Sequence, residues 1–187
     1  MIHPFDRRLS LISNSHLPLS SIPYMSNLNL RRLSRSDLPR LRQFWIEHWG
    51  SEEMITRGNV HRPEQLDGFV VENGDRTAWI GLLTFFIQHG ECEVTSLDSL
   101  RERQGIGSLL MDKAIAEART RDCRRLFLIT TNDNLHALGF YQKRGFEIVT
   151  VYRGAVNESR KRRPGIPLVG NDGIPLRDEI ELEMLLK

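Results

Sequence analysis

The sequence contains little of what defines several classes of protein. Cysteine occurs only twice, at Cys92 and Cys123, which is too few for a disulfide scaffold or for a four-ligand zinc site made of cysteine alone. Apolar runs stay short of the roughly 18 residues that a membrane-spanning helix needs. The 26 basic and 24 acidic residues leave a net charge of +2, which gives no electrostatic sign of nucleic-acid binding. We therefore expect a cytoplasmic protein with reduced cysteines that binds neither membranes nor nucleic acids.

Length and composition favour one globular domain preceded by a leader. The chain has 187 residues, of which 40% are hydrophobic and 27% charged, as is usual for a single globular domain. Residues 1–24 are instead rich in serine and proline and contain one acid, Asp6. This composition predicts a disordered leader over 1–24 and a domain over 25–187. Two alternatives stay open: the leader reflects start-codon choice and the domain starts at Met25, or the leader is an organelle transit peptide whose helix its prolines interrupt.

Apolar periodicity and turn residues predict the elements of the first half. Ser36 is the predicted N-cap of the first helix, and residues 50–67 are polar and turn-rich, with no predicted element. Asn73-Gly74-Asp75 and Gly90 are hairpin signals, so the strands around them are expected to pair antiparallel. The predicted elements are an edge strand over 28–33, a helix through Leu38, Leu41, Trp45 and Trp49, and strands over 69–71, 77–87 and 92–97.

Helices and strands alternate in the second half. Asn132-Asp133 is the predicted cap of the second helix there, and Gly145 is placed to end it. A meander followed by this alternation predicts an α/β fold with a mixed, mostly antiparallel central sheet flanked by helices. The predicted elements are helices over 107–121 and 134–144, a buried strand over 126–129, and strands over 146–152 and 180–186.

A glycine turn lies between a predicted strand and a predicted helix. It reads Arg103-Gln104-Gly105-Ile106-Gly107-Ser108. Two glycines let the backbone turn tightly, and the helix that follows directs its positive dipole end at the same place, so the turn suits a phosphate or pyrophosphate. No Gly-Lys-Ser/Thr follows, so it is not a P-loop. A plain strand-to-helix turn is the alternative interpretation.

The second predicted helix of this half carries a polar face. Asn134, Ala137 and Tyr141 are three and four residues apart, so they share one face of the helix. An asparagine and a tyrosine with a small alanine between them leave a groove for a slender ligand. A half-buried core tyrosine is the alternative.

Taken together, the two segments are much more specific than either alone. The order is strand, glycine turn, helix, buried strand, then N-x-x-A-x-x-x-Y-x-x-x-G-F, and it resembles the GNAT superfamily of acyl-CoA-dependent N-acyltransferases. The family's pattern at the turn is Gln/Arg-x-x-Gly-x-Gly/Ala. This chain departs from it at Glu102, where Arg103 can supply the missing positive charge. The resemblance covers residues 27–187 and is strongest over 93–146.

The resemblance implies acetyl-CoA as the cosubstrate and no metal. The strand that ends at the glycine turn and the strand over 126–131 would splay apart to admit the cosubstrate. Asn134 would hydrogen-bond its pantetheine arm, and Tyr141 would lie near the thioester sulfur. Two backbone segments would bind the rest of it: Thr95, Ser96 and Leu97 would hold the pantetheine arm, and the amides of Arg103, Gln104, Gly105, Ile106, Gly107 and Ser108 would hold the pyrophosphate.

The implied reaction is direct attack of a primary amine on the thioester, followed by proton donation from Tyr141 to the leaving thiolate. An alkylamine has a pKa near 10, so it needs a base before it can attack. Glu91 and Glu93 are the candidates, and Glu93 is preferred because it lies two residues from Thr95 on one strand face. The alternative for Glu93 is a solvent-facing strand residue.

We expect the acceptor to be a small-molecule amine or a protein amine, and the protein to be a monomer or a homodimer. In this family the acceptor meets regions that correspond here to 45–62 and 154–178. The latter is a long connection, predicted to be functional or disordered. Its Arg160-Lys161-Arg162-Arg163 run is either solvated or a contact for an acidic acceptor or for the cosubstrate's 3′-phosphate. His61 and His136 are expected at the surface. A non-catalytic acyl-CoA-binding sensor module is the alternative function.

Overall fold

A central sheet of seven strands organises the protein. The computed structural model describes residues 28–101 and 103–186, so the predicted leader over 1–24 lies outside the described residues. The strand order is β1-β4-β5-β6-β7-β9-β8, and every neighbouring pair is antiparallel except β6 and β7. This confirms the predicted fold class. The strands are β1 Asn29–Arg32, β4 Asp67–Glu72, β5 Trp79–Gln88, β6 Glu91–Ser99, β7 Arg125–Thr131, β8 Glu147–Tyr152 and β9 Glu179–Leu185.

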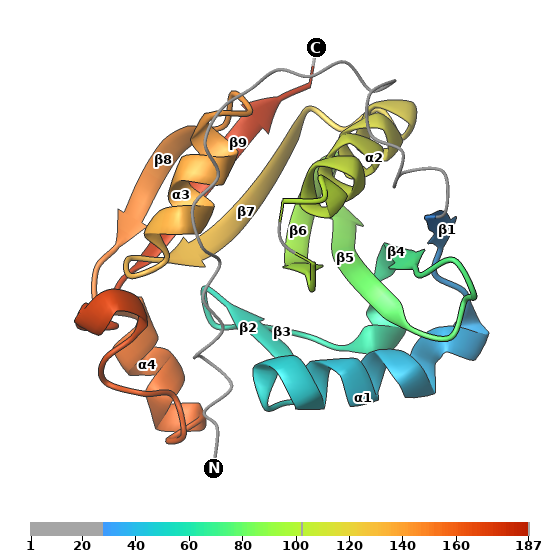
Figure 1. The fold of residues 1–187 in the computed structure, drawn as a ribbon. Coiled ribbons are helices and arrows are strands. Elements are labelled where there is room, and N and C mark those ends of the chain that lie inside the picture. The colour runs from blue at the N-terminus through green and yellow to red at the C-terminus, as the bar shows by residue number, and fades with distance from the viewer. Residues whose placement is uncertain (1–27, 102, 187) are drawn as a thin grey trace.

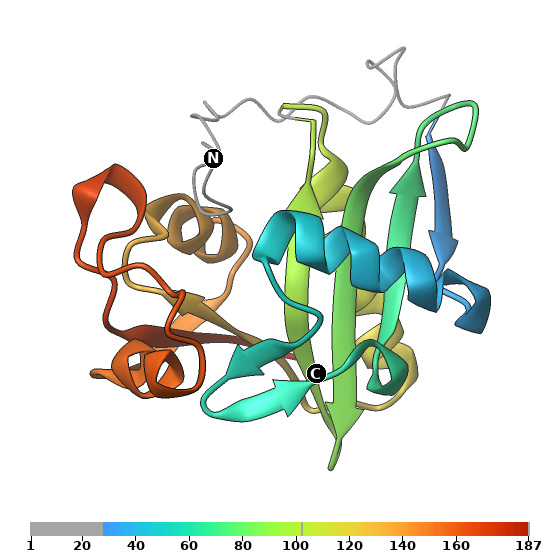
Figure 2. The ribbon, with the colours of Figure 1, turned by 90° about the horizontal axis from the view of Figure 1, so that it is seen from below.

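Helices cover both faces of the sheet. The helix α1 Leu38–Trp49 packs on one face of β4 and β5, where Trp45 and Leu82 are fully buried. The helix α2 Ile106–Thr120 packs on the other face and forms the larger core cluster. Figure 2 shows the two helices on opposite sides of the strands. Successive strand residues point to opposite faces, so β4 and β5 supply both cores, and their near-continuous apolar sequence follows from this.

Two helix starts differ from the prediction. Ser34, not Ser36, caps the first helical turn, Arg35–Asp37, through a reciprocal pair of hydrogen bonds with Asp37. The helix α3 Leu135–Gln142 begins after Asn134, whose Oδ1 accepts from the Ala137 amide at 3.1 Å. The predicted cap at Asn132-Asp133 is therefore wrong by one to two residues. Gly145 follows the helix with φ +86°, a conformation that glycine adopts without strain.

Two regions predicted without regular structure contain it. A two-stranded sheet, β2 Met54–Thr56 and β3 Asn59–His61, lies within 50–67. The long connection over 154–178 contains the helix α4 Ala155–Arg162 and a short turn, Asn171–Gly173. Each strand of the hairpin is three residues long, and α4 is almost entirely polar. Neither the hairpin nor α4 therefore shows a periodic spacing of apolar residues from which the sequence could predict it.

The sheet forks between β6 and β7. The two strands pair only from Glu91 opposite Arg125 to Val94 opposite Leu128, and they separate beyond that point (Figure 1). β7 stays paired with β9 as far as Thr131 opposite Glu179. The predicted splay of the two strands is confirmed, and it divides the sheet into a β1-β4-β5-β6 half and a β7-β9-β8 half.

Candidate functional site

The open edge of β6 begins at a β-bulge. Val94 lies opposite Phe85 and Ser96 lies opposite Thr84, so Thr95 is the extra residue. The Thr84 hydroxyl fixes this geometry, because Thr84 Oγ1 lies 2.7 Å from Thr95 Oγ1 and 2.8 Å from Ser96 Oγ. From Thr95 to Leu97 no described strand pairs with the β7 side of β6. The backbone groups along this edge are thus available to bind an extended chain.

The glycine turn at the end of the open edge has the shape of an anion site. Arg103 and Gly105 have left-handed backbones, with φ of 58° and 71°, and such turns gather successive N–H groups on one side. A side chain at Gly105 would meet nothing within 4 Å, so the turn is open there. The amides of residues 106–108 start α2 and have no partner within the helix, and the helix dipole adds positive potential. The residues present therefore fit a pyrophosphate; Glu102 lies outside the described residues.

Tyr141 is buried on α3 beside the fork. Its ring packs edge-on against Phe140 and Phe146, with centroids 5.2 Å and 5.6 Å away, and it is 8% exposed. Burial raises the pKa of Tyr141, and the negative charge of Asp98 raises it further. The phenol therefore keeps its proton throughout the physiological range. Asn134 starts the same helix; its oxygen is used by the helix cap, which leaves its NH₂ group as a donor.

Glu93 is buried, and the β2–β3 hairpin supplies its partners. Thr56 Oγ1 donates to Glu93 Oε1 at 2.6 Å, and His61 Nε2 lies 3.5 Å from the same oxygen. Burial alone would raise the pKa of Glu93, but the hydrogen bonds from His61 and Thr56 hold it below its usual value. His61 is 7% exposed, so its expected surface position is wrong. The short hairpin that carries it against β6 has no signal in the sequence.

The alternative candidate, Glu91, is held in ion pairs. Its Oε2 accepts from Arg125 Nη2 at 3.0 Å, and its Oε1 lies 3.5 Å from Arg124 Nη2. The hydrogen bond from Arg125 lowers the pKa of Glu91 in spite of its partial burial. These contacts favour a structural role for Glu91 between β6 and β7.

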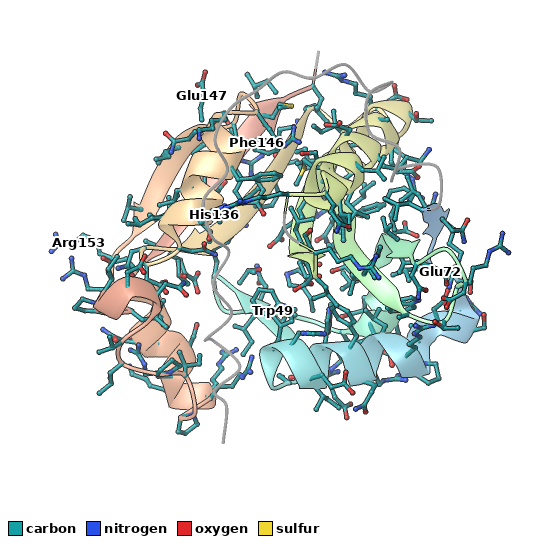
Figure 3. The ribbon with its side chains drawn as sticks, in the orientation of Figure 1. Trp49, Glu72, His136, Phe146, Glu147 and Arg153 are labelled. Carbon is teal, nitrogen blue, oxygen red and sulfur yellow. The ribbon has the colours of Figure 1, made fainter. Side chains whose placement is uncertain are left out.

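Sequence reasoning missed one carboxylate at the fork, Asp98. Trp49 Nε1, at the end of α1, donates to Asp98 Oδ1 at 3.0 Å, and Figure 3 shows Trp49 on the side of α1 that faces the fork. Asp98 Oδ2 is buried and has no hydrogen-bond partner among the described residues. Burial raises the pKa of Asp98 to about 7, although the Trp49 hydrogen bond opposes the shift.

Beyond Glu93, the wall of the fork is acidic. Glu179 and Glu181 of β9 are 5% and 3% exposed. The Arg57 amide donates to Glu179 Oε2 at 2.9 Å, and Arg57 Nη1 donates to Glu181 Oε2 at 3.3 Å. Burial raises the pKa of Glu179. Arg125 Nη1 also donates to Glu181 Oε1, at 2.8 Å. The acidic wall, Glu93, Glu179 and Glu181, therefore holds three buried carboxylates beside two cations, Arg57 and Arg125.

The basic run of α4 is engaged with backbone carbonyls. Arg160 donates to the Pro167 carbonyl at 2.7 Å and to that of Leu176, which ties the connection to itself. Arg163 donates to the carbonyls of Trp49 at 3.2 Å and Glu53 at 3.5 Å, at the end of α1. The run is therefore not simply solvated. The hydrogen bonds of Arg163 connect the end of α4 to the end of α1, and we call this connection the α4 brace.

Two further classes of site do not occur in the described part of the chain. Within residues 28–101 and 103–186, no group of three or more His, Cys, Asp or Glu side chains is placed to hold a metal ion. No helix in those ranges is long and apolar enough to cross a membrane.

A forked sheet with an anion-accepting turn at one end of the opening defines a class of fold. The model of the Acetyltransferase (GNAT) family matches residues 30–146, and the chain belongs to this family. It is similar to the uncharacterized protein YxbD of Bacillus subtilis (strain 168), with 42% identity over 139 residues, which are 74% of this chain and 87% of YxbD.

Solved structures share the fold at low sequence identity. An IAA acetyltransferase from Bacillus cereus ATCC 14579 has a TM-score of 0.65 and 19% identity, and the match covers 85% of this chain and 99% of that one. A GNAT family acetyltransferase from Elizabethkingia anophelis with acetyl-CoA bound has a TM-score of 0.64 and 19% identity, covering 86% and 99%. At this identity the two structures establish the fold.

Proposed function

We propose that the protein transfers an acetyl group from acetyl-CoA to a primary amine by direct attack of the amine on the thioester. One observation carries the proposal: β6 and β7 part at Val94, and the open edge of β6 leads directly to the anion-accepting turn at Arg103–Ser108. An extended arm that ends in a pyrophosphate fits this arrangement. Acetyl-CoA supplies both the arm and an activated acetyl group.

Each binding group has a defined task in this proposal. The backbone of Thr95, Ser96 and Leu97 pairs with the pantetheine arm as an added strand would. The amides of Gln104, Gly105, Ile106, Gly107 and Ser108, with that of Arg103, hold the pyrophosphate. The Asn134 side chain donates to the arm from the opposite side of the fork.

The reaction needs proton transfers that the chain can make. The amine lone pair forms the new C–N bond, the C–S bond breaks, the sulfur takes a proton from the Tyr141 hydroxyl, and a proton that the nitrogen loses restores that hydroxyl. The buried Tyr141 keeps that proton until the thiolate develops. Glu93, whose hydrogen bonds favour its ionised form, lies on the acceptor side, attracts the ammonium form of the amine and takes its proton before the attack. The acidic wall supports a small cationic amine or a basic protein amine as the acceptor.

Thiol release from acetyl-CoA tests the proposal. The acceptors are a panel of a polyamine, amino acids, an aminoglycoside and a peptide with a free N-terminus, and thermal stability is measured in parallel with acetyl-CoA. We expect stabilisation by mass action, about 2.7 kcal/mol at 100 times the Kd, and thiol release with at least one amine. Stabilisation without thiol release would support the sensor module instead. If neither effect is observed, acetyl-CoA binding itself is contradicted.

A further inference from the structure

Two carboxylates lie on the same face of β6 at the fork. The bulge at Thr95 adds one residue to β6, so residues 93, 96 and 98 of β6 lie opposite β5 residues that are two apart. Strand residues two apart share a face, so residues 93, 96 and 98 share one as well. The pairs are Glu93 with Phe86, Ser96 with Thr84 and Asp98 with Leu82. Leu82 belongs to the core beneath α1, so both carboxylates face the α1 side, where the hairpin and Trp49 also lie.

The environments of the two carboxylates are opposite in kind. Glu93 accepts from Thr56 at 2.6 Å and has His61 at 3.5 Å, so its ionised form is stabilised. Asp98 accepts from Trp49 at 3.0 Å, and its Oδ2 is buried without a partner among the described residues. The groups that face Asp98 are the Trp49 indole from α1 and the Tyr141 phenol from α3. Neither carries a positive charge.

Two carboxyl groups whose environments separate their affinities for a proton are suited to separate tasks. An alkylammonium has a pKa near 10, and a base accepts its proton most effectively when its own pKa lies near the working pH. The pKa of Asp98 is about 7, whereas that of Glu93 lies below its usual value. Glu93 is thus the poorer proton acceptor and the better permanent anion.

We propose that Asp98 Oδ2 takes the proton from the acceptor ammonium, directly or through one water, while Glu93, roughly 13 Å away along β6, attracts the cationic acceptor to the fork. The inference rests on the proposed acetyl transfer and replaces Glu93 as its base. The first proton of the ammonium passes to Asp98, and the lone pair it leaves forms the C–N bond. The C–S bond then breaks, and sulfur takes the Tyr141 proton. The second nitrogen proton restores Tyr141, and Asp98 releases its proton to solvent.

Trp49 provides a direct readout of Asp98 that needs no acceptor. Its indole N–H donates to the carboxylate, so the NMR shift of that N–H follows the ionisation of Asp98. Trp49→Phe assigns the signal among the three tryptophans. In the full chain with CoA added, we expect the signal to titrate with a midpoint near 7 and to lose the titration in Asp98→Asn. A midpoint near 4 overturns the inference, whether or not an acceptor has been found.

Kinetics with an amine that the thiol-release panel identifies test the role itself. We expect Asp98→Asn to lower kcat/KM by about 100-fold or more. It should also abolish the decrease of kcat/KM below about pH 7, which is the acid limb of the pH profile. Trp49→Phe removes the hydrogen bond that lowers the Asp98 pKa, so its acid limb should move to higher pH. Glu93→Gln should raise the acceptor KM and keep the acid limb. Asp112→Asn, on the exposed side of α2 with 68% of its side chain accessible, is the matched control and should match wild type.

The outcomes separate the two proposals. Turnover in Asp98→Asn within about threefold of wild type, with the acid limb kept, overturns the role of Asp98 and leaves acetyl transfer standing. An acid limb lost in Glu93→Gln and kept in Asp98→Asn assigns the base to Glu93. Absence of thiol release with every amine, while Trp49 still titrates near 7, counts against the proposed reaction. Trp49→Phe keeps the test available if Asp98→Asn does not fold.

Discussion

Tyr141 combines two properties that a proton donor needs. It is buried against Phe140 and Phe146, which fixes its ring, and both burial and the Asp98 charge raise its pKa. A donor of this kind interacts with charge that develops on the sulfur in the transition state and contributes little to the bound ground state. Replacing it should therefore change turnover and not binding.

We expect Tyr141→Phe to lower kcat by about 100-fold while the KM for acetyl-CoA changes little. The matched control is Tyr152→Phe, which removes the other tyrosine hydroxyl of the described region; that hydroxyl donates to Glu181 at 2.5 Å, so a change in the acceptor KM is allowed but kcat should stay at its wild-type value. Steady-state thiol release and the acetyl-CoA-induced shift in melting temperature provide the measurement. Unaltered turnover in Tyr141→Phe would show that water or another residue protonates the thiolate.

The glycine turn is the element whose backbone performs the binding. At Gly105 the φ of 71° favours glycine and strains a branched residue, whereas space for a side chain is available. A branched residue there must twist the amides away from the pyrophosphate. We expect Gly105→Val to weaken acetyl-CoA binding by about tenfold or more, measured by calorimetry. Gly165→Ala, where nothing lies within 4 Å and no positive φ is required, is the control and should bind acetyl-CoA normally.

An ion-pair network joins β1, β4 and the start of α1. Arg31 donates to Asp37 Oδ1 and Oδ2 at 2.9 Å and 2.8 Å and to Glu72 Oε1 at 2.8 Å. The hydrogen bond from Arg31 lowers the pKa of Asp37 to about 2 and also lowers that of Glu72. A carboxyl group with a depressed folded pKa stabilises the protein above its unfolded pKa, near 4 for Asp. That contribution disappears as the pH falls from about 4 toward 2.

Replacing Arg31 by Met should therefore lower the melting temperature at pH 7 by roughly 2–4 °C, or about 1 kcal/mol, since Arg31 is partly exposed and salt screens the pair. The difference from wild type should shrink below about pH 4, as the carboxyl groups of both proteins become protonated. Melting curves at pH 7, 4 and 2 check this. A difference that persists at the lowest pH would assign the destabilisation to packing of the Arg31 stem.

Elements with a long apolar period were predictable, and short or polar ones were not. The spacing of Leu41 and Trp45 and the apolar run over 126–129 led to the correct helix and strand because burial dictates that pattern. The three-residue strands that bring Thr56 and His61 to Glu93 are too short to show a period. At the site, Tyr141 lies within a recognisable spacing. Asp98 does not, because its environment depends on Trp49, 49 residues away along the chain.

At the scale of the whole molecule, the fork would leave the two halves of the sheet joined by few contacts. Direct pairing of β6 with β7 ends at Val94 opposite Leu128. The α4 brace supplies a second connection on the opposite side of the opening, since Arg163 reaches the end of α1 and Arg162 Nη1 donates to the Gly58 carbonyl at 3.1 Å. The β6–β7 pairing therefore closes one end of the opening and the α4 brace closes the other, and the acceptor side lies between the two ends.

This arrangement predicts that the brace governs the acceptor and not acetyl-CoA. The carbonyls that Arg163 binds, those of Trp49 and Glu53, lie next to the partner of Asp98 and the approach to Glu93. Arg163→Gln should raise the KM of the acceptor by about tenfold and leave that of acetyl-CoA unchanged. The effect should depend little on salt. The substitution removes short-range hydrogen bonds to carbonyls, whereas a long-range field is screened within about 10 Å by 0.1 M salt.

Lys161→Gln is the matched control for Arg163→Gln, since Lys161 is 71% exposed and pairs with Glu158 of its own helix at 2.6 Å. It removes the same charge from the same region without touching α1, so both Michaelis constants should stay at their wild-type values. If the control raises the acceptor KM as much as Arg163→Gln does, and salt abolishes both effects, the basic run attracts an acidic acceptor and the acidic wall does not select it. If Arg163→Gln raises the KM of acetyl-CoA alone, the run serves the 3′-phosphate, and the acceptor must then be selected by Glu93 and the β9 carboxylates without the brace.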